Sequence, residues 1–358
     1  MIPFYKPAPL HLDAKGLDCL LQSGQLTNWG QYYQQLQIVL QTYLRNTPTT
    51  LVASGTHALE LSLHALRYLD MLPPNARIAL PSFTFIATAQ AIVNAGMTPI
   101  FVDIDPNTWT LDISKLYDLD VDAVIPVNIF GVESPGLPQY ITIGDISHGF
   151  GGTVDGLPNG LEYTISAFST SITKPFHTVE GGIVCSKHSE LIRVIEQMRR
   201  WGLDGQYECW HRGMWSKISE LHCLVGLCNL SYLQEAIVRK HTIVRLYQQA
   251  LSGSDVIFQK IPKNTYTTYK DCGILLPDIT TRTDIIRKFD EANIGYKLYF
   301  SPAAHQTKYF SQFSSSLLSD LSNTENIASR IICLPIYDGI TELEVDQIIT
   351  VIRSVLGG

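Results

Sequence analysis

Short apolar runs alternate with helix-like stretches over the first 220 residues. Most of these runs are continuously apolar, which is typical of strands that are covered on both faces. We expect strands at Leu51–Ala53, Arg77–Leu80, Ile100–Val102, Ala123–Val127, Ile141–Ile143, Ile165–Ser169 and Gly182–Cys185. Helices are predicted between them, notably at His57–Leu69 and Ile86–Ala95. This alternation of strand and helix predicts a large α/β domain with a mostly parallel sheet.

The pattern changes after Glu220. Leu221–Leu251 has the composition of one long helix. Beyond it we expect strands at Val256–Gln259 and Gly273–Leu276 and helices at Thr281–Ala292 and Glu342–Leu356. These elements predict a smaller α+β domain at the carboxyl end. We place the large domain at residues 1–235 and the small one at 236–358.

Composition narrows the class of protein. The chain has 358 residues, of which 45% are hydrophobic and 16% charged, so it can bury one large core and a second, smaller one. A disordered chain would have the opposite balance. The net charge of -7 provides no basic face for phosphate backbones, so we expect no nucleic-acid partner.

The cysteines indicate a reducing compartment. There are seven of them, scattered and without a C-x-x-C pair, which favours buried reduced thiols in a cytoplasmic protein. No segment is apolar enough to span a membrane, and the first residues lack the pattern of a signal peptide. His57, His64 and His188 do not have ligand spacing, so we expect no metal site.

Three segments carry residues suited to cofactor chemistry. Ser54-Gly55-Thr56 lies between a strand and a helix, where backbone N–H groups can bind an anion, although ordinary helix capping is the alternative. Asp145 follows a buried strand and could hold a pyridine nitrogen protonated, or could also be a helix cap. Lys174 lies in a polar turn between two apolar strands. Lysine forms Schiff bases with aldehyde cofactors, although most loop lysines are solvated surface charges.

The order of these segments is more informative than any one of them. A phosphate turn, an aspartate and a lysine each follow a strand in turn, and in an open α/β sheet ligands bind where strands end. The chain resembles the DegT/DnrJ/EryC1/StrS family of sugar aminotransferases, which are fold-type I enzymes that use pyridoxal 5′-phosphate (PLP). The similarity runs over nearly the whole chain. It includes IPFYKPAP (2–9), SGQLTNWG (23–30), SGTHALELSLHAL (54–66), GDISHGFGG (144–152), FSTSITKPFHTVEGGIV (168–184), YFSPAAHQTKYF (299–310) and CLPIYDGITELEVDQIITVI (333–352).

The resemblance implies a role for each matching residue. Lys174 falls at the family's Schiff-base lysine and Asp145 at the aspartate that pairs with the pyridine nitrogen. His148 matches the residue that lies against the cofactor ring, and Phe85 the aromatic residue on its opposite face. The phosphate would be bound by Gly55, Thr56 and Ser169.

The chain also departs from the family pattern. Trp215 stands where the family has an asparagine that reaches the cofactor phosphate of the neighbouring subunit, and Lys217 stands where it has an arginine. We expect this contact to be lost, or replaced by Ser216 or Lys217. Tyr299-Phe300 replaces the family's His-Tyr near the sugar site. Trp215, Tyr299 and His305 are the candidates for substrate binding, with a structural role as the alternative for His305.

By resemblance, the chain transfers an amino group from an amino acid, usually glutamate, to the keto group of a nucleotide-linked deoxysugar. The cofactor would alternate between PLP and pyridoxamine phosphate, and the enzyme would be a homodimer with shared active sites. Alternatives are transfer to a non-nucleotide cyclic ketone such as a cyclitol, and a non-catalytic regulator that kept the scaffold. The family's sugar dehydratases usually have histidine in place of the lysine, so Lys174 argues against that activity.

Overall fold

A seven-stranded sheet forms the centre of the larger part of the molecule. The computed structural model describes residues 1–7, 12–316 and 320–357, so the last two residues of the IPFYKPAP segment lie outside the described residues. The strand order is β1 (Thr49–Val52), β9 (Gly182–Cys185), β8 (Ile165–Ser169), β5 (Ile141–Asp145), β4 (Ala123–Val124), β2 (Arg77–Pro81) and β3 (Thr98–Val102). All neighbours pair in parallel except β9, which is antiparallel to both β8 and β1. The prediction of a mostly parallel sheet is confirmed.

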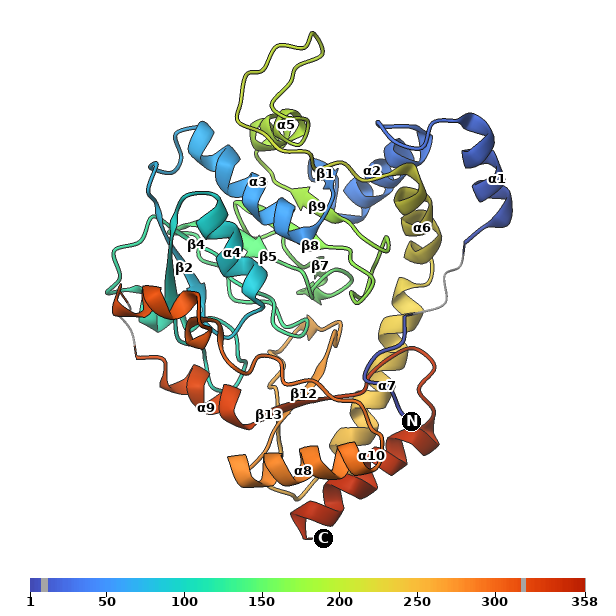
Figure 1. Ribbon diagram of the computed structural model, residues 1–358, viewed down its shortest axis with the longest axis vertical. Helices are drawn as coiled ribbons and strands as arrows, with labels where there is room; N and C mark the ends of the chain where they lie inside the picture. Colours follow the sequence, from blue (N-terminus) through green and yellow to red (C-terminus); the bar gives the residue numbers. More distant parts are fainter. Residues whose placement is uncertain (8–11, 317–319, 358) are drawn as a thin grey trace.

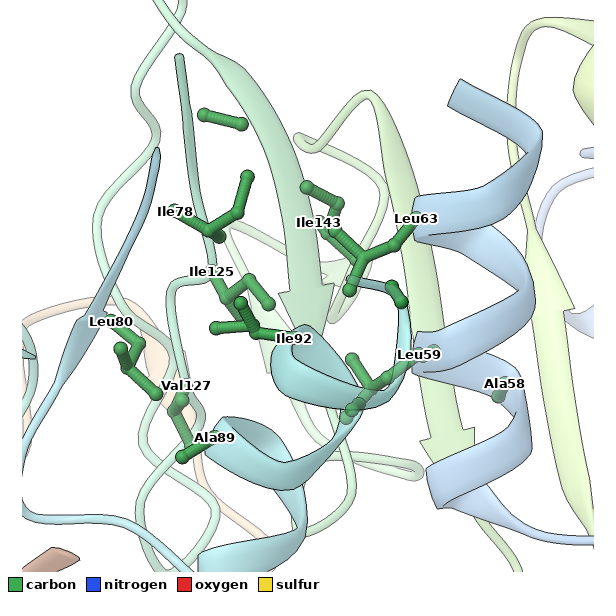
Figure 2. Close-up of a cluster of buried hydrophobic side chains, with 14 of the residues drawn as sticks. Ala58, Leu59, Leu63, Ile78, Leu80, Ala89, Ile92, Ile125, Val127 and Ile143 are labelled. Carbon is green, nitrogen blue, oxygen red and sulfur yellow. The ribbon is translucent and has the colours of Figure 1, made fainter. Parts of the chain in front are cut away.

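Helices cover both faces of this sheet (Figure 1). One face is covered by α3 (Gly55–Tyr68), α4 (Ile86–Asn94) and α5 (Ser189–Met198), whose apolar side chains share a core with the strands. Figure 2 shows Leu59 and Leu63 of α3 and Ile92 of α4 directed toward the strand residues of this core. The other face is covered by α2 (Gln31–Tyr43) and α6 (Glu220–Leu230), and α1 (Ala14–Ser23) packs against α6. This double cover explains why the strands are continuously apolar.

Alternate residues of one strand belong to different cores. Ala167 and Val184 lie in the core beneath α3, whereas their neighbours Phe168 and Ile183 lie in the core beneath α2 and α6. Successive side chains of a strand point to opposite faces, so both sets must be apolar when both faces are buried.

The predicted single helix over Leu221–Leu251 is wrong, because the structure has two helices there. α6 ends at Leu230, α7 begins at Leu233 and ends at Ala250, and the two are bent by 60°. Polar side chains at the break bind backbone groups instead of continuing the helix. Ser231 donates its hydroxyl to the carbonyl of Cys228, and Asn229 donates its amide to the carbonyl of His177. The bend lets α6 and α7 pack against different parts of the molecule.

The carboxyl-terminal part has its own sheet and core. An antiparallel sheet of β10 (Ile257–Phe258), β12 (Cys272–Leu275) and β13 (Ile331–Leu334) packs with α8 (Ile279–Glu291) and α10 (Glu342–Leu356). Leu233 and Ile237 of α7 lie in the core beneath α2, whereas Ile243 and Tyr247 lie in the carboxyl-terminal core. α7 therefore carries the chain from one core to the other, and the domain boundary at residue 235 stays a prediction.

The remaining elements connect these layers. They are β6 (Thr153–Val154), β7 (Leu157–Pro158) and β11 (Thr265–Tyr266), which form a small third sheet, the helix α9 (Ser322–Arg330) and the 3₁₀ turns η1 (Ile113–Leu116), η2 (Ala304–Gln306) and η3 (Phe310–Ser316). Within the described ranges, no single helix is long and apolar enough to cross a membrane, and α6 and α7 meet that length and composition only as a bent pair.

Candidate active site

The predicted site residues follow strands that end at the same edge of the sheet. β1, β2, β5 and β8 run in the same direction, since β9 is antiparallel to both β1 and β8. Their carboxyl ends carry the Ser54–Thr56 turn, Phe85, Asp145 and Ser169. One pocket at this edge is lined by Gly55, Thr56, Phe85, Asp145, His148, Ser169, Lys174 and Tyr299. The fold thus brings together residues from segments that are distant in the sequence.

The turn before α3 has the structure of an anion site. Ser54 caps the helix by accepting the N–H of His57 on its hydroxyl, and its carbonyl accepts the N–H of Ala58. The N–H groups of Gly55 and Thr56 precede the first intrahelical bond, so they and the helix dipole are available to an anion. A side chain at Gly55 would bring a Cβ to 2.6 Å from the Cβ of Ser169. Only glycine allows this close approach of the turn to β8.

The side chain of Asp145 is held in a fixed direction where it lines the pocket. Asp145 is the last residue of β5 and only 5% exposed. Thr88 donates its hydroxyl to Oδ2 at 2.8 Å, and the N–H of Ser147 donates to Oδ1 at 3.1 Å. Hydrogen bonds from both neighbours satisfy the anion and fix its direction, which suits a carboxylate that pairs with a protonated ring nitrogen.

His148 is held as a neutral imidazole. Its Nδ1 accepts the N–H of Phe130 at 3.2 Å, and its ring stacks on that of Phe130 with 6.3 Å between centroids. Burial lowers the pKa of His148 well below its usual value, and the nearby charge of Lys174 lowers this pKa further. Because Nδ1 is an acceptor, the proton lies on Nε2.

Phe85 presents an exposed aromatic ring at the pocket. It precedes α4, and 56% of its surface is open to solvent. Its ring lies 6.3 Å from the ring of Phe300, centroid to centroid. Exposure of a large aromatic residue at a pocket is expected where a flat ligand later covers it.

Lys174 is the titratable group whose environment best suits Schiff-base chemistry. It lies in the loop between β8 and β9, and its N–H donates to the carbonyl of Ser171. Burial, followed by the charge of Lys270, lowers the pKa of Lys174 to about 8, although Asp145, Asp271 and Glu180 oppose the shift. A lysine with this pKa supplies a useful fraction of neutral amine near neutral pH.

The structure places two further candidates away from the pocket. The ring of Trp215 stacks on that of Trp201 with 4.1 Å between centroids, and Trp215 is 46% exposed. His305 is buried, with Nδ1 2.6 Å from the Ser82 hydroxyl and Nε2 3.2 Å from Glu325. Neither side chain lines the pocket. In this chain the contacts of His305 link the end of β2 to α9, which is a structural arrangement.

The residues beside Trp215 are also engaged within the chain. Ser216 is fully buried and accepts the N–H of Ala53, and its hydroxyl lies 3.1 Å from Nδ1 of His57. Lys217 donates to the side chain of Asn28 and lies over the ring of Trp215. Ser216 therefore supports the turn that precedes α3 from within the same chain.

Sequence reasoning missed several residues that line the pocket. Thr88 carries no local signal, because its role depends on the contact between α4 and the end of β5. Lys270 comes from the carboxyl-terminal part, 96 residues after Lys174, and has no motif around it. Glu180, in the turn after the lysine loop, also lines the pocket. Among the described residues, no group of three or more possible metal ligands is found.

The fold and the pocket define an α/β enzyme that carries PLP. The residues fit this cofactor because an anion turn, a fixed carboxylate, an aromatic ring and a lysine of lowered pKa surround one space. The chain belongs to the DegT/DnrJ/EryC1/StrS aminotransferase family, whose model matches residues 12–353. The predictions of the family, the fold and a PLP-dependent aminotransferase are therefore confirmed.

Relatives of known name cover nearly the whole chain. An Escherichia coli dTDP-4-amino-4,6-dideoxy-D-glucose transaminase is 26% identical over 95% of this chain and 94% of its own length. A GDP-perosamine synthase from Caulobacter vibrioides is 24% identical over 99% of both chains. The crystal structure of a putative PLP-dependent aminotransferase from Bacillus cereus has a TM-score of 0.89 and 27% identity, covering 98% of this chain and 99% of that one.

Proposed function

We propose that this enzyme transfers the amino group of L-glutamate to a keto group of a nucleotide-linked deoxysugar. The observation that carries the proposal is that the Gly55–Thr56 turn, Asp145 and Lys174 meet in one pocket of a chain from this family. The names of the dTDP-4-amino-4,6-dideoxy-D-glucose transaminase and the GDP-perosamine synthase each contain a nucleotide-linked sugar. The proposal therefore covers nucleotide-linked deoxysugars as a class.

Each residue has a role in holding the cofactor. The N–H groups of Gly55 and Thr56, with the hydroxyl of Ser169, would bind its phosphate, and Asp145 would face its ring nitrogen. Phe85 and His148 would lie against its ring. When bound, PLP supplies an aldehyde that accepts the amino group and a ring that withdraws electrons from the reacting carbon.

Lys174 has two roles in the proposal. Its amine holds the cofactor between reactions and, once released, moves a proton from the α-carbon of the amino donor. The lowered pKa of Lys174, to about 8, supports this role because a neutral amine is needed to accept a proton. His148 stays neutral and cannot compete as a charged acid.

The proposal includes a homodimer in which each subunit completes the other's pocket, as the family resemblance implies. Large aromatic residues on one loop support it, since Trp201, Tyr207, Trp210 and Trp215 are all at least 46% exposed. A cytoplasmic location is also part of the proposal, because the seven cysteines are free thiols, which persist in reducing compartments. Light scattering on the purified protein measures the mass and tests the dimer.

The absorbance spectrum tests the central claim. Wild-type protein with PLP should show a band in the visible range that L-glutamate bleaches, and Lys174→Ala should not hold the cofactor covalently. Candidate keto compounds are then tested for their ability to restore the band. A wild type that never takes up PLP would refute the proposal, and restoration by a non-nucleotide cyclic ketone alone would replace the sugar as acceptor.

A further inference from the structure

Lys270 and Asp271 form a buried ion pair at the wall of the pocket. The ammonium of Lys270 lies 2.9 and 3.0 Å from the two carboxylate oxygens of Asp271. The two residues are 7% and 3% exposed. The N–H of Lys270 also donates to the carbonyl of Phe130, which fixes its backbone beside the segment that carries Asn128 and Ile129. This pair is not explained by the cofactor site described above.

The pair has a direction. Lys270 lines the pocket, whereas Asp271 does not, so the positive end of the pair faces the reacting space. An ammonium has three N–H donors, and both contacts of Lys270 go to one carboxylate, which leaves donor capacity for a ligand. A buried ion pair costs desolvation and is seldom more stable than apolar residues of the same size. Stability alone is thus a weak reason for a charged pair at this position.

The charges of the pocket show what this ammonium could bind. Among the described residues that line the pocket, the cationic side chains are Lys174 and Lys270, and the carboxylates are Asp145 and Glu180. Lys174 is committed to the cofactor in the proposed function, and the phosphate has its own site at the start of α3. An amino acid that enters this pocket brings a carboxylate, which needs a positive partner near Glu180 and Asp145.

We infer that Lys270 binds a carboxylate of the amino donor and that Asp271 positions its ammonium. The inference rests on the proposed function. Lys270 is almost fully buried, so only a compact group can reach it. A carboxylate is compact, whereas the diphosphate of a nucleotide sugar is larger and needs a more open site. The ring of Tyr299 lies 5.8 Å from the ammonium and shapes the same part of the pocket.

The experiment compares four PLP-loaded variants with the wild type. Lys270→Met removes the charge, Lys270→Arg keeps it, and Lys270→Met with Asp271→Asn removes both charges without leaving a buried carboxylate unpaired. Lys187→Met, an exposed residue outside the pocket, is the matched control. The visible band of each protein is recorded first, because it shows that the cofactor is loaded before any donor is added.

The donor is then titrated. For the double variant we expect the concentration of L-glutamate at half-maximal bleaching to rise about tenfold or more, the usual effect of losing a charge-assisted contact. Lys270→Arg should restore part of the affinity, and Lys187→Met should match the wild type. Calorimetry with glutarate, a dicarboxylate that cannot react, should show the same loss of binding in the double variant.

Two outcomes would overturn the inference. One is an unchanged glutamate titration and unchanged glutarate binding in the double variant. The other is a defect confined to the reaction with the keto sugar, which would assign the ammonium to the acceptor. Failure of the wild type itself to load PLP or to be bleached would refute the proposed function instead, so the two failures are distinguishable.

Discussion

The hydroxyl of Thr88 donates a hydrogen bond of 2.8 Å to Oδ2 of Asp145, and so joins α4 to the end of β5. Thr88 is 1% exposed, and its hydroxyl also lies 3.0 Å from that of Thr84. The direction of the Asp145 carboxylate therefore depends on α4, through the hydroxyl of Thr88.

Thr88→Val should weaken PLP binding without unfolding the protein. Valine keeps the shape but removes the donor, which leaves one oxygen of Asp145 without this bond. We expect the dissociation constant for PLP to rise about tenfold or more, as for loss of a hydrogen bond to a charged group. Titration of the cofactor by absorbance measures it, and Thr88→Ser should stay close to the wild type. Equal affinities of the valine and serine variants would show that the contact does not matter.

The pKa of Lys174 should control the rate of cofactor uptake. Burial and the charge of Lys270 lower this pKa to about 8, and the neutral amine is the form that attacks an aldehyde. The rate at which the apoprotein takes up PLP should rise with pH through a midpoint near 8 and level off about one pH unit higher. Lys270→Met should move the midpoint upward, because it removes a like charge. A midpoint near 10.5, the ordinary lysine value, would contradict the burial seen here.

Gly55→Ala should abolish tight binding of the phosphate. The added Cβ would lie 2.6 Å from the Cβ of Ser169 and must push the turn away from β8. We expect PLP affinity to fall at least about tenfold, because the N–H groups of the turn lose their geometry. Gly205→Ala is the matched control, since a Cβ there meets nothing within 4 Å. Similar cofactor affinities of the two variants would be incompatible with a phosphate site at this turn.

Glu133 should make stability depend on pH. Burial raises the pKa of Glu133 to about 7, although its Oε1 accepts the N–H of Gly160 at 2.7 Å. A raised pKa means that the folded state holds the proton more tightly than the unfolded state, so stability falls as pH rises from about 4.5 to about 7 and is level above that. Glu133→Gln should remove this part of the dependence.

Denaturant unfolding from pH 4 to 8 checks the prediction for Glu133. The advantage of Glu133→Gln over the wild type should be absent at pH 4 and grow to a constant value above about pH 7. Glu208→Gln, at an exposed position that does not affect the pKa of Glu133, should follow the wild type. An advantage that is the same at every pH would mean that the carboxyl does not titrate with the raised pKa.

His305→Ala should destabilise the protein and leave donor binding unchanged. The imidazole joins Ser82 to Glu325, and its removal leaves the buried hydroxyl of Ser82 without its partner on the ring, whereas Glu325 is exposed to solvent. We expect a loss of about 1–3 kcal/mol in the free energy of unfolding. His188→Ala, at the exposed end of α5, is the control. A normal stability together with a weaker response to glutamate or the keto sugar would return His305 to the substrate site.

The sequence predicted those parts of the fold that depend on local pattern. Continuous apolar strands and the order of turn, aspartate and lysine were enough for the sheet and its functional edge. The predicted bounds of α10, Glu342–Leu356, match the structure, in which Thr341 and Glu344 form a capping box at the start of the helix. The break between α6 and α7 was missed because Ser231 and Tyr232 do not by themselves interrupt a helical pattern.

Other features depend on contacts that no local pattern contains. Lys270 faces the pocket only because the segment before β12 packs beside Phe130, and its partner is its own neighbour in the chain. For His305 the sequence left a substrate role and a structural role open, and its contact with Glu325 comes from α9, which was not predicted. In both cases the surroundings of a charged or polar residue come from distant segments, and these decide between a site and a structural contact.

β9 separates the strands that lead to the two anchoring points proposed for the cofactor. It lies between β1, which leads to the Gly55 turn, and β8, which leads to the Lys174 loop, and is antiparallel to both. The turn nevertheless reaches over β9, because a Cβ at Gly55 would lie 2.6 Å from the Cβ of Ser169 at the end of β8. The chain ends of β1 and β8 are therefore in contact although another strand lies between them. A substitution that displaces one of these two chain ends must displace the other.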